Sequence, residues 1–179
     1  MPERELGPPT GEVAALVGVQ SALGTPEVVS IARAMSHFGE HAAGWVGLSA
    51  AGALLSRRRR REWLLVGVGA LAAHAAAIVI KMVVRRARPN HPEVEVNVTT
   101  PSALSFPSAH ATSTSAAAIL LCRATGSPLP LAMVPLMAAS RLVLGVHYPS
   151  DVVAGIGVGT VVAGTAARLA GRGKESGRS

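Results

Sequence analysis

Long runs of apolar residues, separated by short polar or charged segments, dominate the chain. A helix needs roughly 20 mostly apolar residues to cross a bilayer. Four runs come close to that length, at about 38–55, 63–84, 128–147 and 150–170. A fifth run, at about 108–124, is shorter and opens with polar residues that lipid would expel unless they faced the protein interior. The pattern predicts an all-α, polytopic membrane bundle of about five transmembrane helices.

The segments outside these runs predict the remaining organisation. Residues 12–23 and 26–36 have apolar faces too short to span a bilayer, so we expect N-terminal interfacial helices. Thr25, followed by proline and glutamate, is a start signal for the second helix. Residues 87–107 hold four prolines without a helical period, which predicts one long loop. We therefore divide the chain into an interfacial segment (1–36), a transmembrane domain (37–171) and a basic tail (172–179).

Composition supports a membrane location and argues against nucleic acid as a partner. Apolar residues make up 49% of the 179 residues and aromatic residues only 3%, so small and aliphatic side chains must form the packing surfaces. A net charge of +7 could indicate nucleic-acid binding, but five arginines form one run, Arg57 to Arg61, between two apolar segments. Such a run sets membrane topology or contacts anionic lipid. We expect membrane lipids, and no nucleic acid, as partners.

Three short segments carry polar residues that could surround one phosphate. They are Lys81-x6-Arg88-Pro89, Pro107-Ser108-Ala109-His110 and Ser140-Arg141-x5-His147-x3-Asp151. Lys81 and Arg88 lie two helical turns apart, so we expect both on one face of a helix that Pro89 ends. Cations aligned in this way can hold two edges of a phosphate. For the neighbouring Arg85 and Arg86 we favour the alternative, in which the side chain reaches for lipid headgroups.

The second and third segments add a helix start and a histidine–aspartate pair. Ser108 is a candidate N-cap, and the free N–H groups of a helix start form an anion site beside His110. His147 and Asp151 straddle a turn into the next span. An aspartate can fix the tautomer of a histidine, which then serves as a nucleophile on phosphorus. A purely structural pair that caps a helix is the alternative for this segment alone.

Together the three segments resemble the signature of the type 2 phosphatidic acid phosphatase (PAP2) superfamily. That pattern reads Lys-x6-Arg-Pro, Pro-Ser-Gly-His and Ser-Arg-x5-His-x3-Asp, and it recurs here in order within residues 81–151. Ala109 replaces the usual glycine, and its extra methyl group narrows the anion site. The resemblance implies a metal-independent phosphoric monoester hydrolase in the membrane, without a cofactor.

The resemblance also implies a role for each site residue. His147 would attack phosphorus to form a phosphohistidine, Asp151 would orient it, and His110 would protonate the leaving alkoxide and then activate water. The phosphate oxygens would be held by Lys81, Arg88, Ser108, Arg141 and the N–H groups near Ala109 and His110.

A lipid phosphate is the substrate that the resemblance implies. The short chain and residues 7–20 are similar to family members acting on decaprenylphosphoryl-5-phosphoribose, a polyprenyl-linked precursor of cell-wall arabinan. Polyprenyl diphosphate, phosphatidic acid and phosphatidylglycerophosphate are alternative substrates for the same chemistry. A non-catalytic protein that binds anionic lipid is the alternative of a different class, and the complete histidine–aspartate set argues against it.

Charge predicts the side of the membrane on which the three segments lie. With five spans, ten cations fall on the face of Arg57–Arg61 and seven on the other, and three of those seven belong to the segments above. The remaining ratio is ten to four, which predicts a cytoplasmic poly-arginine face. The site would then lie on the extracytoplasmic face of the plasma membrane.

Three further features have structural interpretations. Residues 37–41 match the His-x-x-Glu-His pattern of inverted zinc peptidases, but without a distal acidic ligand we expect an interfacial helix or the mouth of the site. His74 lies within a span, where we expect a neutral histidine bonded to a neighbouring helix. Gly155-x3-Gly159 predicts close helix packing, within the bundle or between subunits of a homo-oligomer.

Overall fold

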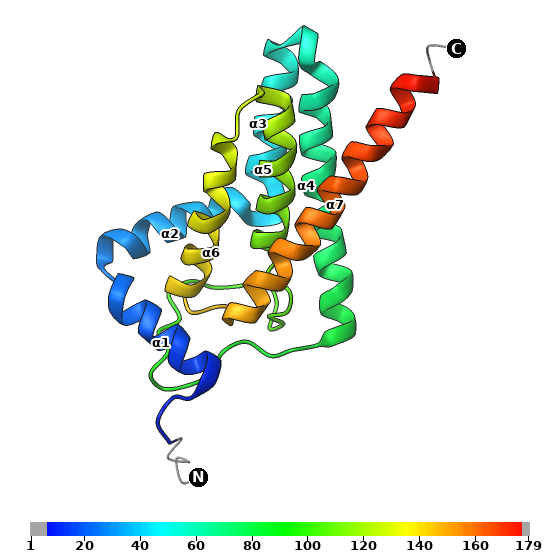
Figure 1. The fold of residues 1–179 in the computed structure, drawn as a ribbon. Coiled ribbons are helices and arrows are strands. Elements are labelled where there is room, and N and C mark those ends of the chain that lie inside the picture. Colours follow the sequence, from blue (N-terminus) through cyan, green and yellow to red (C-terminus); the bar gives the residue numbers. More distant parts are fainter. Residues whose placement is uncertain (1–6, 177–179) are drawn as a thin grey trace.

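The computed structural model describes residues 7–176, and within them the chain is helical and contains no strand (Figure 1). The α-helices are α1 (Gly11–Leu23), α2 (Pro26–Gly39), α3 (Ala43–Leu55), α4 (Arg60–Val84), α5 (Ala109–Thr125), α6 (Met133–Val143) and α7 (Pro149–Ser176). Three short 3-10 helices are η1 (Glu40–Ala42), η2 (Arg57–Arg59) and η3 (Leu129–Ala132). The prediction of an all-α bundle is confirmed.

The helices form an upright bundle with a shorter helical pair across one end. In the bundle, α5 packs against both α4 and α7, and α3 packs against α4 (Figure 1). α6 lies between α5 and α2, and α1 contacts α6 and the start of α7. The chain bends by 114° between α1 and the helical unit of α2 and α3. The long loop after α4 and the turn before α7 meet at the end that α1 covers.

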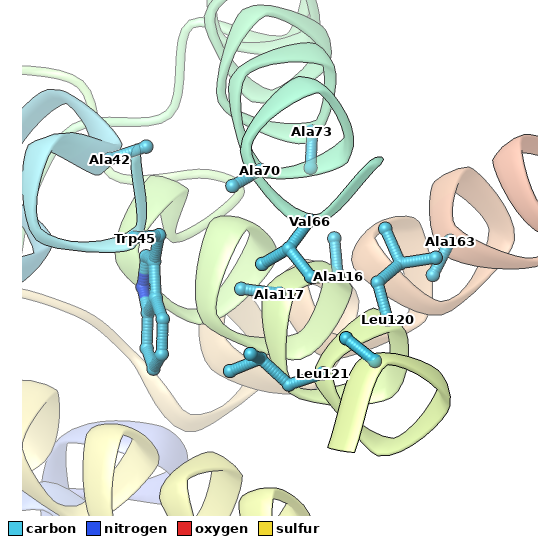
Figure 2. Packing of buried hydrophobic residues seen from close by; sticks show 11 residues of the cluster. Ala42, Trp45, Val66, Ala70, Ala73, Ala116, Ala117, Leu120, Leu121 and Ala163 are labelled. Carbon is cyan, nitrogen blue, oxygen red and sulfur yellow. The ribbon is translucent and has the colours of Figure 1, made fainter. Parts of the chain in front are cut away.

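Small side chains allow the bundle helices to approach closely (Figure 2). Alanines make up most of the central cluster: Ala42, Ala70, Ala73, Ala116, Ala117, Ala124 and Ala163. Trp45 is the largest buried side chain there, and its Nε1 donates to Thr114 Oγ1 at 3.2 Å. An alanine and glycine surface suits helices that associate in lipid by van der Waals packing rather than by hydrophobic burial.

The polar run that opens α5 faces the protein interior. Its side chains are at most 1% exposed from Thr112 to Ser115. Thr112 Oγ1 donates to the carbonyl of Ser108 at 2.8 Å, so part of its hydrogen bonding is satisfied within the helix. The prediction that this segment would be internal is confirmed, and α5 is the central helix of the bundle.

The predicted helix starts are correct, but the predicted end of α4 is wrong. Thr25 Oγ1 accepts from Val28 N and Ser108 Oγ from Ala111 N, both at 3.4 Å. α4 ends at Val84, where Arg85 adopts a left-handed conformation (φ 53°). After Arg85, the start of the long loop pairs with the end of the same loop: the N–H of Ser105 donates to the carbonyl of Arg86 at 2.8 Å.

Arg88 therefore lies in the loop and not on α4. Our expectation that Lys81 and Arg88 share one helical face is wrong, since the chain leaves the helix four residues before Pro89. The loop conformation nevertheless brings the two cations to one cavity, as described below.

Two described helical segments are long and apolar enough to cross a membrane, Arg57–Val84 and Pro149–Arg172. The bent pair Gly11–Leu23 and Pro26–Leu55 adds a third if it counts as one span. α3, α5 and α6 contain 13, 17 and 11 residues, fewer than the roughly 20 that a span needs. The count of five spans thus stays a prediction, as does the division at residues 36 and 171. Residues 1–6 and 177–179 of the outer segments lie outside the described residues.

The basic run and the three motifs lie at opposite ends of the bundle (Figure 1). Arg59 of the run donates to the carbonyl of Ala124 at 3.0 Å, and Arg123 pairs with Glu62 at 3.3 Å. The run, the end of α5 and the last turns of α7 therefore share one end. This arrangement agrees with the faces that the charge count assigned to them.

Close packing of α7 on α5 depends on glycines that face α5. A Cβ on Gly155 would lie 2.7 Å from the carbonyl oxygen of Ser108, and one on Gly159 would lie 2.9 Å from Ser115 Cβ. A Cβ on Gly157 would meet nothing within 4 Å. Within the described chain, the predicted glycine contact is therefore made inside the bundle.

We predict that Gly159→Ala lowers the thermal unfolding midpoint of the detergent-solubilised protein by roughly 2–10 °C, because overpacking must push α5 and α7 apart. Gly157→Ala is the matched control. It should leave the midpoint unchanged or raise it, since alanine favours helix over glycine by about 1 kcal/mol. Equal midpoints for the two variants would show that the α5–α7 contact is looser than described.

Candidate active site

A cavity of about 490 Å³ lies where the three motifs meet. It is lined by residues of α2, α4, α5 and α6, of the loop after α4 and of the turn before α7. Six of the eight predicted site residues line it: Lys81, Arg88, Ala109, His110, Arg141 and His147. The other two, Ser108 and Asp151, are fully buried behind its wall. The structure thus brings together side chains that are up to 70 positions apart in the sequence.

Backbone carbonyls hold two of the three cations in place. Lys81 Nζ donates to the carbonyls of Leu104 and Ser105 at 3.1 and 2.9 Å. Arg88 Nε donates to the carbonyl of Ser102 at 2.9 Å, and its Nη1 donates to that of Val146 at 2.6 Å. These bonds orient the charges without neutralising them.

The third cation, Arg141, is 2% exposed. Its guanidinium donates to the hydroxyl of Ser36 on α2 at 3.1 Å and to that of Ser140 at 3.1 Å. No salt bridge found among residues 7–176 involves Lys81, Arg88 or Arg141. Lys81 and Arg141 are buried and Arg88 is half-buried, and charge removed from water without an opposite partner is costly. An anion bound among the three cations would therefore be stabilising.

Asp151 lies in the first turn of α7 and is 0% exposed. Its Oδ2 accepts from the backbone N–H of Tyr148 at 2.8 Å, and its Oδ1 accepts from Arg86 Nη1 at 3.0 Å. His147 Nδ1 lies 3.5 Å from Oδ2, which is ion-pair range but outside hydrogen-bond geometry. The carboxylate is therefore fixed by two donors and directed at the His147 ring.

The partners of His147 determine which ring nitrogen carries the hydrogen. Nε2 lies 3.4 Å from Arg88 Nη1, and a guanidinium can only donate. Nε2 therefore presents its lone pair, and the hydrogen sits on Nδ1 toward Asp151. Burial lowers the pKa of the imidazole to about 4, against the opposing effect of Asp151. At neutral pH the ring is thus uncharged, with the lone pair of Nε2 available for attack.

The start of α5 supplies the opposite wall of the cavity. Ser108 caps the helix, and Ala109 and His110 are its first two residues, whose N–H groups have no partner within a helix. His110 Nε2 lies 3.0 Å from the carbonyl oxygen of Ser36. A carbonyl only accepts, so Nε2 carries the hydrogen and Nδ1 keeps a lone pair. The hydroxyl of Ser108 does not line the cavity, and its contact with the site is through the cap.

Arg86 does not extend to lipid headgroups as we expected. Its Nη1 donates to Asp151 Oδ1, and its Nη2 pairs with Glu12 of α1 at 2.6 Å. The guanidinium also lies 4.0 Å above the centre of the Tyr148 ring. Glu12 in turn accepts from the backbone N–H of Ser150 at 2.9 Å, so α1 holds the start of α7. The partners of Arg86 are 65 and 74 positions away, and no local pattern indicates them.

The N-terminal helices also hold the long loop against the site. Gln20 of α1 donates to the carbonyl of Glu95 at 2.6 Å, and Arg33 of α2 donates to that of Asn97 at 2.7 Å. Residues 98–102 of this loop line the cavity. The loop is therefore a fixed wall of the site in this structure.

The three other histidines that the sequence singled out also line the cavity. They are His37 at the end of α2, His41 in η1 and His74 in α4, and Glu40 joins them. His74 does not bond to a neighbouring helix, contrary to our expectation. Its Nδ1 is buried and lacks a hydrogen-bond partner in the described part of the chain. Among residues 7–176, no group of three or more His, Cys, Asp or Glu has metal-site geometry.

Comparison with known proteins agrees with the geometry. The chain is 68% identical over 148 residues to a decaprenylphosphoryl-5-phosphoribose phosphatase of Mycolicibacterium smegmatis. The matched residues make up 82% of each chain. It is 61% identical over 155 residues to the Mycobacterium tuberculosis protein of the same name, covering 86% of this chain and 88% of that one.

A solved structure shows a similar fold. It is the crystal structure of a transmembrane PAP2-type phosphatidylglycerolphosphate phosphatase from Bacillus subtilis, with a TM-score of 0.70 and 19% sequence identity. The similarity covers 89% of this chain and 86% of that one. Residues 62–174, which include all three motifs, match the PAP2 superfamily. On this match and on the identity to its relatives, the chain belongs to the PAP2 superfamily.

Proposed function

We propose that this protein is a membrane phosphatase that removes the 5-phosphate from decaprenylphosphoryl-5-phosphoribose through a phosphohistidine intermediate. The observation that carries this proposal is a set of three cations beside the neutral His147 ring: Lys81 and Arg141 are buried and Arg88 is half-buried. None of them pairs with a carboxylate among residues 7–176. A binding protein would need the cations, but it would not need an oriented nucleophile among them. The relatives' names supply the substrate.

In the first step, His147 Nε2 attacks phosphorus and the bond from phosphorus to the sugar oxygen breaks. The negative charge of the bound phosphate favours a second proton on His110, at Nδ1. His110 gives this Nδ1 proton to the sugar oxygen, which leaves as an alcohol. Lys81, Arg88 and Arg141 stabilise the charge on the phosphoryl oxygens, which is the main requirement of phosphoryl transfer. Asp151 stabilises the positive charge that the His147 ring gains.

In the second step, water attacks the phosphorus of the phosphohistidine. His110 accepts a proton from that water, the bond from phosphorus to Nε2 breaks, and inorganic phosphate leaves. His147 returns to its neutral form, so the cycle needs only water as a co-reactant. Ser108 contributes by capping α5, which directs the first N–H groups of that helix at the phosphate.

The position of the cavity suits a substrate anchored in lipid. Ile78 and Met82 of α4 line it and are 43% and 65% exposed on the surface of a predicted span. A prenyl chain can therefore leave the cavity along α4 into the bilayer. The excess of cations at the opposite end favours an extracytoplasmic site in the plasma membrane.

We predict that His147→Asn lowers phosphate release from a prenylphosphoryl-5-phosphoribose by roughly 10³-fold or more, because no other side chain replaces the nucleophile. The measurement is release of inorganic phosphate by the purified protein in detergent. His91→Asn, a histidine in the loop but outside the cavity, should stay within about twofold of the unchanged protein. Equal release by the His147 variant and the unchanged protein would contradict the proposed mechanism.

We also predict that Arg86→Ala lowers kcat by roughly 10–100-fold, as expected when a charged group loses a hydrogen bond worth about 1.5–3 kcal/mol. KM should change little, because Arg86 acts on Asp151 and does not line the cavity. Steady-state kinetics on the same substrate separate the two constants. Arg123→Ala, which breaks a salt bridge at the other end of the bundle, is the control. A raised KM with unchanged kcat would show that Arg86 binds the substrate itself.

A further inference from the structure

We propose that His41 and His74 form a subsite for the sugar of the substrate, binding hydroxyl groups of the pentose between the phosphate and the lipid. This inference rests on the proposed phosphatase function and deepens it. It assigns a specificity-determining role to two histidines that the phosphoryl-transfer steps do not use.

The first argument is position along α4. His74, Ile78 and Lys81 are spaced i, i+4 and i+7, so they share one face of the helix, and all three line the cavity. His74 lies two turns before Lys81, about 10 Å nearer the middle of the helix. The cavity therefore presents cations near the end of the span and a histidine deeper in it. In the proposed substrate the order is 5-phosphate, ribose, phosphodiester and prenyl tail, so the ribose lies next to the phosphate that is removed.

The second argument is the unsatisfied state of His74. The residue lies within the span Arg57–Val84, where a polar side chain usually faces a partner or a polar cavity. Its Nδ1 is buried and bonds to nothing in residues 7–176. The ring faces that of His41 with centroids 5.8 Å apart. Rotation of the His74 ring by half a turn exchanges Nδ1 for a carbon and brings the unpaired nitrogen toward the cavity that the residue lines. A ligand hydroxyl there can then donate to or accept from either histidine.

The third argument is the backbone at His41. This residue and Ala42 both have left-handed conformations, with φ of 50° and 60°. Residues other than glycine rarely adopt this conformation, and such strain concentrates at ligand sites. Here it turns the chain from α2 into α3 and places the His41 ring opposite His74. The kink thus completes the subsite from two separate elements.

Charge favours a sugar over a second phosphate at this end of the cavity. Glu40 lines it, and its Oε2 lies 3.8 Å from His37 Nδ1. A carboxylate accepts hydrogen bonds from hydroxyl groups but repels a phosphate. Two of the cations, Lys81 and Arg88, lie near His147 instead, and Arg88 Nη1 is 3.4 Å from its Nε2. The histidine end is therefore suited to a neutral, hydroxylated group.

Two substrates with the same tail test this assignment. Farnesylphosphoryl-5-phosphoribose carries the sugar, and farnesyl monophosphate does not. His74→Phe retains ring volume and removes the hydrogen bonds, His41→Ala removes the second ring, and His91→Phe is the control outside the cavity. kcat/KM is measured for each protein with each substrate in detergent.

We expect both cavity variants to lose about tenfold in kcat/KM for the sugar substrate, mainly through KM, as when a site loses a hydrogen bond to its ligand. Farnesyl monophosphate should be hydrolysed within about twofold of the unchanged protein, which also shows that the variants are folded. If His74→Phe does not accumulate in the membrane, His41→Ala decides alone, since its side chain is exposed at the kink.

An equal loss for both substrates, or no loss for the sugar substrate, would overturn the subsite while leaving the phosphatase function intact. If the unchanged protein releases phosphate from neither substrate, the phosphatase proposal itself is wrong. The two failures are therefore distinguishable in one experiment.

Discussion

The buried carboxylate of Asp151 is the constraint on which the site depends. A carboxylate removed from water must be paired, and here its donors come from separate parts of the chain. Arg86 reaches it from the loop after α4, and Tyr148 donates from the turn before α7. The backbone carbonyl of Asp151 also accepts from the N–H of Ser108 at 2.9 Å, and this bond joins the starts of α7 and α5. Asp151, which touches neither solvent nor cavity, thus positions both the proposed nucleophile His147 and the proposed anion site.

The cations impose the opposite requirement. Lys81, Arg88 and Arg141 are held by carbonyls and hydroxyls, so their charge is directed but not cancelled. Placing them together costs folding free energy, and the alanine-packed bundle of α3, α4, α5 and α7 must offset it. In the mechanism that we propose, the same uncompensated charge attracts the phosphate and stabilises its transition state. The packing that stabilises the fold therefore lies in the helical bundle, and the charges proposed for catalysis lie at the cavity.

Motif spacing predicted most of the site because the family pattern constrains residues that meet at one cavity. Lys81, Arg88, Ala109, His110, Arg141 and His147 line it, and Asp151 lies directly behind His147. Hydrophobic pattern likewise predicted the helices and the internal polar run of α5. These features depend on local sequence or on a pattern shared by relatives.

Features fixed by long-range contacts were not predictable in this way. α4 ends at Val84 because Arg85 turns left-handed and the next residues pair with the loop, and nothing before Pro89 indicates this. We expected Arg86 to reach lipid headgroups, because its acidic partners, Glu12 of α1 and Asp151 of α7, are distant in the sequence. His74 was expected to bond to a helix, and only the folded cavity shows that its Nδ1 lacks a partner among the described residues.

The central claim is that His147 becomes covalently phosphorylated. The direct measurement is to mix the purified protein with substrate labelled at the 5-phosphate, quench in alkali, which preserves phosphohistidine, and map the label by mass spectrometry. The His110→Ala variant should accumulate more of the intermediate, since it lacks the base that activates water. The account predicts label on the peptide that contains His147. Product formation without label there, or label on another residue, would contradict it.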